Sequence, residues 1–174
     1  MILKHFNESK MKDMMNTDCA ISITKKRDVC MIREIVKNDL EGLLRLYMQL
    51  HDNPMPEKTA ELLQIWDDIF QDKNHHVIVA EENEKIVSSC VCVIISNLTH
   101  NQRPYAFIEN VITDEKFRKR GLATQCLNFA KEIAIKENCY KMMLLTGSKK
   151  ESTLDFYRKA GYNSEDKTAF IQWI

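Results

Sequence analysis

The sequence contains no run of about 18 apolar residues, so no helix long enough to cross a bilayer is expected. Its first ten residues, MILKHFNESK, also lack the apolar stretch of a secretory signal. An excess of one charge is absent as well, because 25 Lys and Arg residues balance 25 Asp and Glu residues. We therefore expect a cytoplasmic protein with neither a membrane nor a nucleic-acid partner, since nucleic-acid binders usually carry a basic excess.

Cysteine pairs of the C-x-x-C type are missing among the six cysteines. Cys90 and Cys92 stand two apart in SSCVCVIIS, and a strand would point both to the same apolar face. We interpret the cysteines as free thiols of a reducing compartment. The adjacent His75 and His76 would face opposite sides of a strand, and the other histidines are scattered, so no metal site is expected.

The length of 174 residues predicts one globular domain, and 44% apolar residues can supply its core. Residues 1–30 are polar and lack a sustained period, so we interpret them as an N-terminal extension. The compact domain then spans residues 31–174. It begins with the alternating segment MIREIVK.

Apolar spacing places helices and strands along this domain. Strands are expected over 31–37, 75–83, 85–96, 105–113, 141–146 and 167–174, and helices over 39–51, 56–71, 121–138 and 151–160. Asn38 and Asp39 are suited to cap the first helix, while Asn138 and Gly161 are suited to end the last two. The order β-α-α-β-β-β-α-β-α-β predicts an α/β (α+β) fold with a mixed sheet and helices on its faces.

The stretch TDEKFRKRGLAT, residues 113–124, carries the chemistry. A strand ends, a short basic turn follows, and a helix begins near Gly121. A helix N-terminus leaves about four backbone N–H groups unpaired and carries about half a positive charge, which favours an anion such as a pyrophosphate. The segment matches neither the G-x-x-x-x-G-K-[ST] loop nor the G-x-G-x-x-G fingerprint.

The segment RKRGLA, residues 118–123, resembles the R/Q-x-x-G-x-G/A signature of the GNAT family of N-acetyltransferases. LDFYRKAGY, residues 154–162, is similar to the FYxKxGF ending of the same family. The resemblance covers residues 31–174 and implies the GNAT fold, in which the central sheet is splayed. It also implies acetyl-CoA as cosubstrate and direct transfer of the acetyl group to an amine in a ternary complex.

The resemblance implies roles for two groups of residues around the cosubstrate. Backbone N–H groups would hold the pyrophosphate at Arg118, Lys119, Arg120, Gly121, Leu122, Ala123 and Thr124. The strand end at Val111, Ile112 and Thr113 would pair with the pantetheine arm. An asparagine common in the family about seven residues before the tyrosine is replaced here by Lys150, so that side-chain contact differs.

Two catalytic residues follow from the same resemblance. Tyr157 stands where the family commonly has the tyrosine that protonates the departing thiolate, and Glu109 stands where many members accept the amine proton, often through water. A base is needed because an alkylamine with a pKa near 10.4 is mostly charged at neutral pH.

The acceptor amine is expected near the end of the first helix, at Tyr47, His51 and Asn53, with Arg103 and Tyr105 within reach. FIEN and ENCYK make the chain more distantly similar to glucosamine-6-phosphate N-acetyltransferases. Those enzymes carry an acidic residue where this chain has LTG, residues 145–147, which argues against a sugar phosphate. We expect a small-molecule primary amine.

Two alternatives stay open, namely a catalytically silent CoA-binding regulatory module and a protein or peptide N-acetyltransferase. Retention of Tyr157 and Glu109 favours catalysis. The apolar end FIQWI suits an interface between two copies, so a homodimer is expected.

Overall fold

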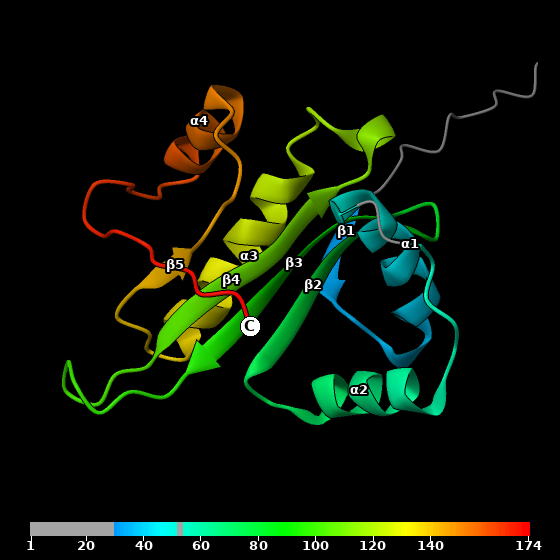
Figure 1. Ribbon diagram of the computed structural model, residues 1–174, viewed down its shortest axis with the longest axis horizontal. Coiled ribbons are helices and arrows are strands. Elements are labelled where there is room, and N and C mark those ends of the chain that lie inside the picture. Colours follow the sequence, from blue (N-terminus) through cyan, green and yellow to red (C-terminus); the bar gives the residue numbers. More distant parts are fainter. Residues whose placement is uncertain (1–29, 52–53) are drawn as a thin grey trace, which may run out of the picture.

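The computed structural model describes residues 30–51 and 54–174 and contains one mixed five-stranded sheet with the order β1-β2-β3-β4-β5 (Figure 1). The first four strands pair antiparallel, and β5 joins β4 in parallel. The strands are β1 Met31–Glu34, β2 His75–Glu82, β3 Lys85–Ile95, β4 Tyr105–Thr113 and β5 Met142–Leu144. The helices are α1 Leu40–His51, α2 Ala60–Gln71, α3 Leu122–Lys136 and α4 Glu151–Lys159.

The alternation of side chains along β2 builds two cores, one on each face of the sheet. Ile78 and Ala80 belong to the core that contains the buried stripe of α3, and Phe156 and Tyr157 of α4 pack against it. Val77 and Val79 face the other way, into the core that contains Leu43 of α1 and Trp66 of α2. Helix α3 therefore covers one face of the sheet, and α1 and α2 cover the other.

The pairing of β4 with β5 is short and leaves an opening in the sheet. Only Ala106–Ile108 pairs with Met142–Leu144, whereas β4 continues to Thr113. Just past this pairing the register of β3 and β4 shifts between Ser89 and Val91, and Asn110 takes a left-handed φ of 50°. Strands β4 and β5 thus diverge at the point where β4 is bulged.

The expected fold class is confirmed, and most of the expected elements are present. Residues 105–113 form β4 with the predicted bounds, and both Asn138 and Gly161 have left-handed φ, at 56° and 93°. Helix α2 begins at Ala60, where Thr59 caps it by accepting from the Leu62 N–H at 3.2 Å, rather than at residue 56. Asp39 does not cap α1 as expected, because its carboxylate accepts from the Val36 N–H and pairs with Arg33.

The prediction of a last strand over residues 167–174 is wrong. The segment follows α4 without regular structure, and its apolar side chains are exposed, Phe170 at 92% and Trp173 at 89%. A strand needs a neighbour that offers backbone groups, and the edge strand β5 is only three residues long. Alternating sequence alone therefore does not form a strand here.

Five of the six cysteines lie in the described residues and are free thiols, three of them buried, while Cys19 lies outside that part. Burial raises the pKa of the Cys126 thiol to about 12, so it packs as a small apolar side chain. No helix within the described residues is long and apolar enough to span a membrane.

Candidate functional site

The loop between β4 and α3, residues 114–121, presents backbone N–H groups at one end of the sheet. Lys119 and Gly121 both take left-handed φ, 62° and 78°, and α3 begins at Leu122 directly after Gly121. Gly121 stands at the N-cap position with no side-chain cap, so the first amides of the helix are left without such a partner. A Cβ at Gly121 would meet the Gln125 side chain at 4.0 Å, which is an ordinary contact, so it is the φ of 78° that favours glycine there.

Side chains from other elements hold this loop in place. The Gln49 side chain of α1 accepts from the Glu115 N–H at 3.1 Å and donates to Asp114 at 3.1 Å. The Asp114 carboxylate also accepts from the Lys116 N–H at 2.9 Å, and the Arg118 guanidinium donates to the Thr113 carbonyl at 3.2 Å. The amides at the start of α3 are therefore presented on a fixed backbone.

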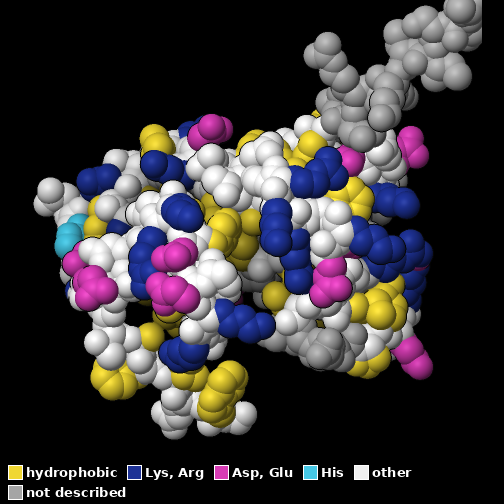
Figure 2. Space-filling view, turned by 90° about the horizontal axis from the view of Figure 1, so that it is seen from above, with side chains coloured by type: hydrophobic (Ala, Val, Ile, Leu, Met, Phe, Trp, Pro, Cys, Tyr) yellow, Lys and Arg dark blue, Asp and Glu magenta, His cyan; other side chains and the backbone are white. Residues whose placement is uncertain are grey.

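The surface around the loop is suited to an anion. Figure 2 shows this end of the molecule from above, with Lys and Arg side chains on both sides of a recessed apolar strip. Arg118, Lys119 and Arg120 are exposed and belong to the loop itself. Positive side chains beside a helix N-terminus attract negative groups such as phosphates.

Glu109 and Tyr157 lie near each other, beside the opening between β4 and β5. Glu109 pairs with Val91, so its exposed side chain lies on the α1 face of the sheet, just past the last residue of β4 that pairs with β5. Tyr157 reaches the opening from α4, packed against Phe156 and edge-on to Tyr162. Burial raises the pKa of the Tyr157 phenol, and the charge of Glu109 raises it further, which keeps this hydroxyl protonated at neutral pH.

Tyr47 approaches the bulge of β4 from the α1 side. Burial raises the pKa of Tyr47 to about 12, although the polar Ser89 and Asn110 side chains beside it lower this pKa. The Ser89 hydroxyl is fully buried and has no hydrogen-bond partner within the described residues. A phenol, a hydroxyl and an amide thus gather on the face of the sheet opposite α3.

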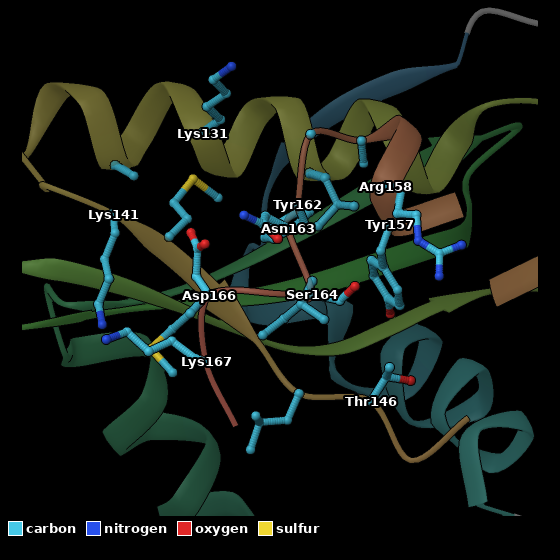
Figure 3. Close-up of a pocket in the computed structure, with 18 of the residues that line it drawn as sticks. Lys131, Lys141, Thr146, Tyr157, Arg158, Tyr162, Asn163, Ser164, Asp166 and Lys167 are labelled. Carbon is cyan, nitrogen blue, oxygen red and sulfur yellow. The ribbon is translucent and has the colours of Figure 1, made fainter. Parts of the chain in front are cut away.

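A cavity of about 700 Å³ extends from Tyr157 away from the loop, between α3, β5, α4 and residues 161–169 (Figure 3). Lys131 and Lys141 lie at one side of it and Arg158 at the other, with Asp166 between them. Its lining includes Tyr157 but neither Glu109 nor residues 114–121. The cavity therefore adjoins the opening and is distinct from the amides at the start of α3.

The other residues expected near the acceptor lie elsewhere or outside the described part. Arg103 donates to the carbonyls of Asn138 and Cys139, at 3.1 and 2.9 Å, and so caps the end of α3. Tyr105 contacts Tyr140 and Lys141 at the start of β4, about 13 Å along the strand from Glu109.

The structure does not gather Arg103 and Tyr105 with Tyr157, and their contact with an acceptor stays a prediction. His51 is the last residue of α1, but its side chain lies outside the described residues, as does Asn53.

The strand residues expected to contact a ligand arm lie at the end of β4. Ile112 is buried, and its carbonyl accepts from the Ser88 hydroxyl at 2.8 Å. The Thr113 hydroxyl lies 2.8 Å from that of Ser88, and Val111 packs against the core of α3. This stretch lies beyond the pairing with β5, where an added strand could bind.

Three residues of the site were missed by sequence reasoning. Gln49 and Glu82 hold the loop from elements far away in sequence, and an exposed helix position or a strand end gives no local signal for this. Asn110 had a signal, because asparagine inside an apolar strand is typical of a bulge with left-handed φ. Within the described residues no group of three His, Cys, Asp or Glu side chains could hold a metal ion.

The family described as the Acetyltransferase (GNAT) family matches residues 40–162. A proposed acetyltransferase from Agrobacterium tumefaciens has a similar structure, with a TM-score of 0.77 and 36% identity, covering 82% of this chain and 99% of that one.

Two curated relatives are similar in sequence. An uncharacterised N-acetyltransferase of Methanocaldococcus jannaschii is 29% identical over 150 residues, which span 82% of this chain but only 64% of the relative. A glucosamine 6-phosphate N-acetyltransferase of Trypanosoma brucei brucei is 26% identical over 140 residues, covering 78% of this chain and 90% of that protein.

Proposed function

Because the chain belongs to the acetyltransferase (GNAT) family, a family of acyltransferase enzymes, we propose that it transfers the acetyl group of acetyl-CoA to a primary amine of a small molecule. One observation carries the proposal: α3 begins without a side-chain cap beside the point where β4 and β5 diverge. Such a start binds a pyrophosphate, and such an opening admits a thioester arm.

The residues around the opening fit an extended anionic acyl donor. The backbone N–H groups of residues 118–124 hold the pyrophosphate, with the exposed side chains of Arg118 and Lys119 beside it. The pantetheine arm lies along Val111–Thr113, where β4 has no pairing with β5, and the thioester ends near Glu109. Donor and amine then occupy the site together.

Acetyl transfer proceeds by direct attack of the amine on the thioester carbonyl carbon. Glu109, directly or through water, removes a proton from the charged amine and so makes it neutral. A backbone N–H of β4 stabilises the oxyanion, and one such donor contributes about 3 kcal/mol in other enzymes. The new N–C bond forms, the C–S bond breaks, and Tyr157 gives its phenolic proton to the departing thiolate. The nitrogen then loses its second proton through water, and this proton restores the Tyr157 phenol. Tyr157 holds that proton at neutral pH, because burial and the charge of Glu109 raise its pKa.

The acceptor approaches from the α1 face, where Tyr47 and Glu109 lie. We infer a small amine or aminosugar. The name of the Trypanosoma relative supports an aminosugar, but the phosphate in that name is less suited to this chain, because residues 145–147 carry no acidic side chain. His51, Arg103 and Tyr105 remain further candidates for acceptor contacts.

The catalytic domain proposed here is residues 31–174, with residues 1–30 as an extension. We infer a cytoplasmic site of action from the free thiols of the described cysteines. A homodimer is supported by the exposed Phe170, Ile171 and Trp173, which are apolar side chains suited to an interface. Light scattering tests it, and a monomeric mass would count against it.

A thiol-release assay with a panel of amines and aminosugars tests the activity. We expect release of CoA that depends on acetyl-CoA and on one class of amine. Binding of CoA with no release on any amine would favour the silent module, and release only with peptides would favour the protein acetyltransferase. Absence of CoA binding would overturn both the activity and the module.

A further inference from the structure

Glu82, the last residue of β2, is a buried carboxylate paired with an arginine of the β4–α3 loop. Its side chain is 4% exposed, and its two oxygens accept from Arg120 at 3.1 Å and 2.6 Å. Removing a carboxylate from water is costly unless it is paired and hydrogen-bonded, and a bidentate arginine does both. The pair therefore joins the end of β2 firmly to the loop, 38 residues away in sequence.

The alternation of β2 explains why Glu82 faces the loop. Ile78 and Ala80 point to the core of α3, and Glu82 follows them on the same face. Glu81 points to the opposite face, where it pairs with Arg33 of β1 at 2.6 Å. Two neighbouring glutamates thus bind different parts of the molecule.

Arg120 stands between the two left-handed residues of the loop, Lys119 and Gly121. A left-handed conformation is strained in a residue other than glycine, and it persists only where surrounding contacts hold it. The Arg120 guanidinium supplies such contacts, with Glu82 on one side and the ring of Phe117 5.3 Å away. Its pairing with Glu82 directs the guanidinium to the end of β2.

We propose that Glu82 is a positioning residue of the acyl-donor site, which acts by anchoring Arg120 and so fixing the loop amides in their pyrophosphate-binding arrangement. In this arrangement the Arg120 side chain is an anchor, and the phosphate contacts come from the backbone. The inference rests on the proposed function, because it assigns a role around the same pyrophosphate site.

The variant Glu82→Gln tests the role, with Glu81→Gln as its matched control on the other face of β2. The probes are CoA and pantetheine, which lacks the pyrophosphate, and their affinities are measured by calorimetry and competition. We expect Glu82→Gln to weaken CoA binding about tenfold while pantetheine affinity is unchanged, since a tenfold loss corresponds to one charged hydrogen-bonded contact. Glu81→Gln is expected to lower the melting temperature and leave both affinities unchanged.

A merely structural role for Glu82 would lower the melting temperature in both variants and leave the ratio of CoA to pantetheine affinity unchanged, which would overturn the inference. So would an equal loss for both ligands. Failure of the wild-type protein to bind CoA would instead overturn the proposed function, and the inference with it. Wild-type binding together with an unaffected Glu82→Gln variant would overturn the inference alone.

Three further variants keep the test decisive if Glu82→Gln does not fold. Arg120→Lys keeps the positive charge but not the bidentate geometry, so an anchoring role predicts about a tenfold loss of CoA affinity, whereas a simple charge contact to phosphate predicts almost none. In the double variant Glu82→Gln, Arg120→Gln an anchor unit predicts no loss beyond that of Arg120→Gln alone. An additional loss would show that the two side chains act separately, and it would contradict the proposal.

Discussion

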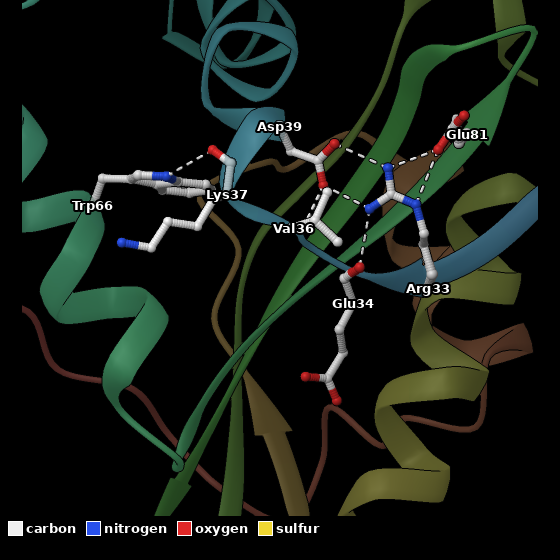
Figure 4. Close-up of polar contacts among 7 residues, drawn as sticks. All are labelled: Arg33, Glu34, Val36, Lys37, Asp39, Trp66 and Glu81. Carbon is white, nitrogen blue, oxygen red and sulfur yellow. Dashed lines mark hydrogen bonds and ion pairs between the residues drawn. The ribbon is translucent and has the colours of Figure 1, made fainter.

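Two ion-pair clusters lie on opposite faces at the end of β2, and they serve different parts of the molecule. On the α1 face, Arg33 bonds to Asp39 and to Glu81, each at 2.6 Å, and joins β1 to β2 and to the start of α1 (Figure 4). On the α3 face, Glu82 bonds to Arg120 of the loop.

The difference lies in what each cluster connects. The α1-face cluster connects regular elements that already pair or pack, so its loss is expected to lower the free energy of unfolding and leave the site intact. The α3-face pair connects a strand to a loop with two left-handed residues, so its loss is expected to change the site. Ion pairs of similar length thus serve stability in one place and ligand geometry in the other.

The largest effect is expected from Tyr157→Phe, on the α3 side. Loss of the proton donor should lower kcat about 100-fold, while the melting temperature stays unchanged because the ring still packs against Phe156 and Tyr162. The raised pKa of Tyr157 further predicts that wild-type kcat does not fall with rising pH until above pH about 10. Steady-state thiol release measures both, and a kcat within threefold of wild type would exclude Tyr157 as the acid.

The next effect is expected on the α1 side, from Asp39→Asn. The variant loses a half-buried ion pair with Arg33 and should lower the free energy of unfolding by about 2 kcal/mol with kcat and CoA affinity unchanged. Denaturant unfolding measures the free energy, steady-state thiol release measures kcat, and calorimetry measures the CoA affinity. A change in CoA affinity as large as that in Glu82→Gln would remove the distinction between the clusters.

The same aspartate gives a pH dependence of stability. Burial raises the pKa of Asp39, but hydrogen bonds from Arg33 and from the Val36 N–H outweigh it, so the pKa lies below the usual value. Its contribution is therefore full above the unfolded pKa of about 3.9 and is lost as pH falls through the folded pKa. Denaturant melts between pH 7 and acid should show a smaller loss in Asp39→Asn than in wild type, and an equal loss would contradict the assignment.

A smaller effect on the α1 side is expected from Trp66→Phe. The buried indole N–H donates to the Lys37 carbonyl at 3.2 Å, and its loss should lower the free energy of unfolding by about 1 kcal/mol. CoA affinity is expected to be unchanged, as for other changes on this face. Chemical denaturation measures the first and calorimetry the second.

The smallest effect is expected from Gln49, whose side chain reaches the loop from α1. Gln49→Ala removes the contacts to Asp114 and Glu115 and should weaken CoA binding about threefold, since the amide can bond to water instead. Met48→Ala, at the exposed neighbouring position, is the control and should leave the affinity unchanged. Equal CoA affinities in the two variants would contradict a role for Gln49 in holding the loop and would leave that role to Glu82.

Local signals predicted most of the fold and the loop on which the candidate site is built. The bounds of β4, the left-handed Asn138 and the loop before α3 follow from apolar period and turn chemistry within a few residues. The partners of Glu82 and Gln49 could not be predicted in this way, because each pairing joins distant segments across a face of the sheet. The prediction of the final strand was wrong for a related reason, since a strand forms only beside another strand at the edge of a sheet, which local sequence does not specify.

The backbone amides of residues 118–124 offer the most direct test of the account. Amide chemical shifts of the wild-type protein are followed by nuclear magnetic resonance during titration with CoA and, separately, with pantetheine. CoA is expected to move these amide signals strongly, and pantetheine is expected to move only signals along Val111–Thr113. Saturating CoA that leaves the signals of residues 118–124 in place would contradict it.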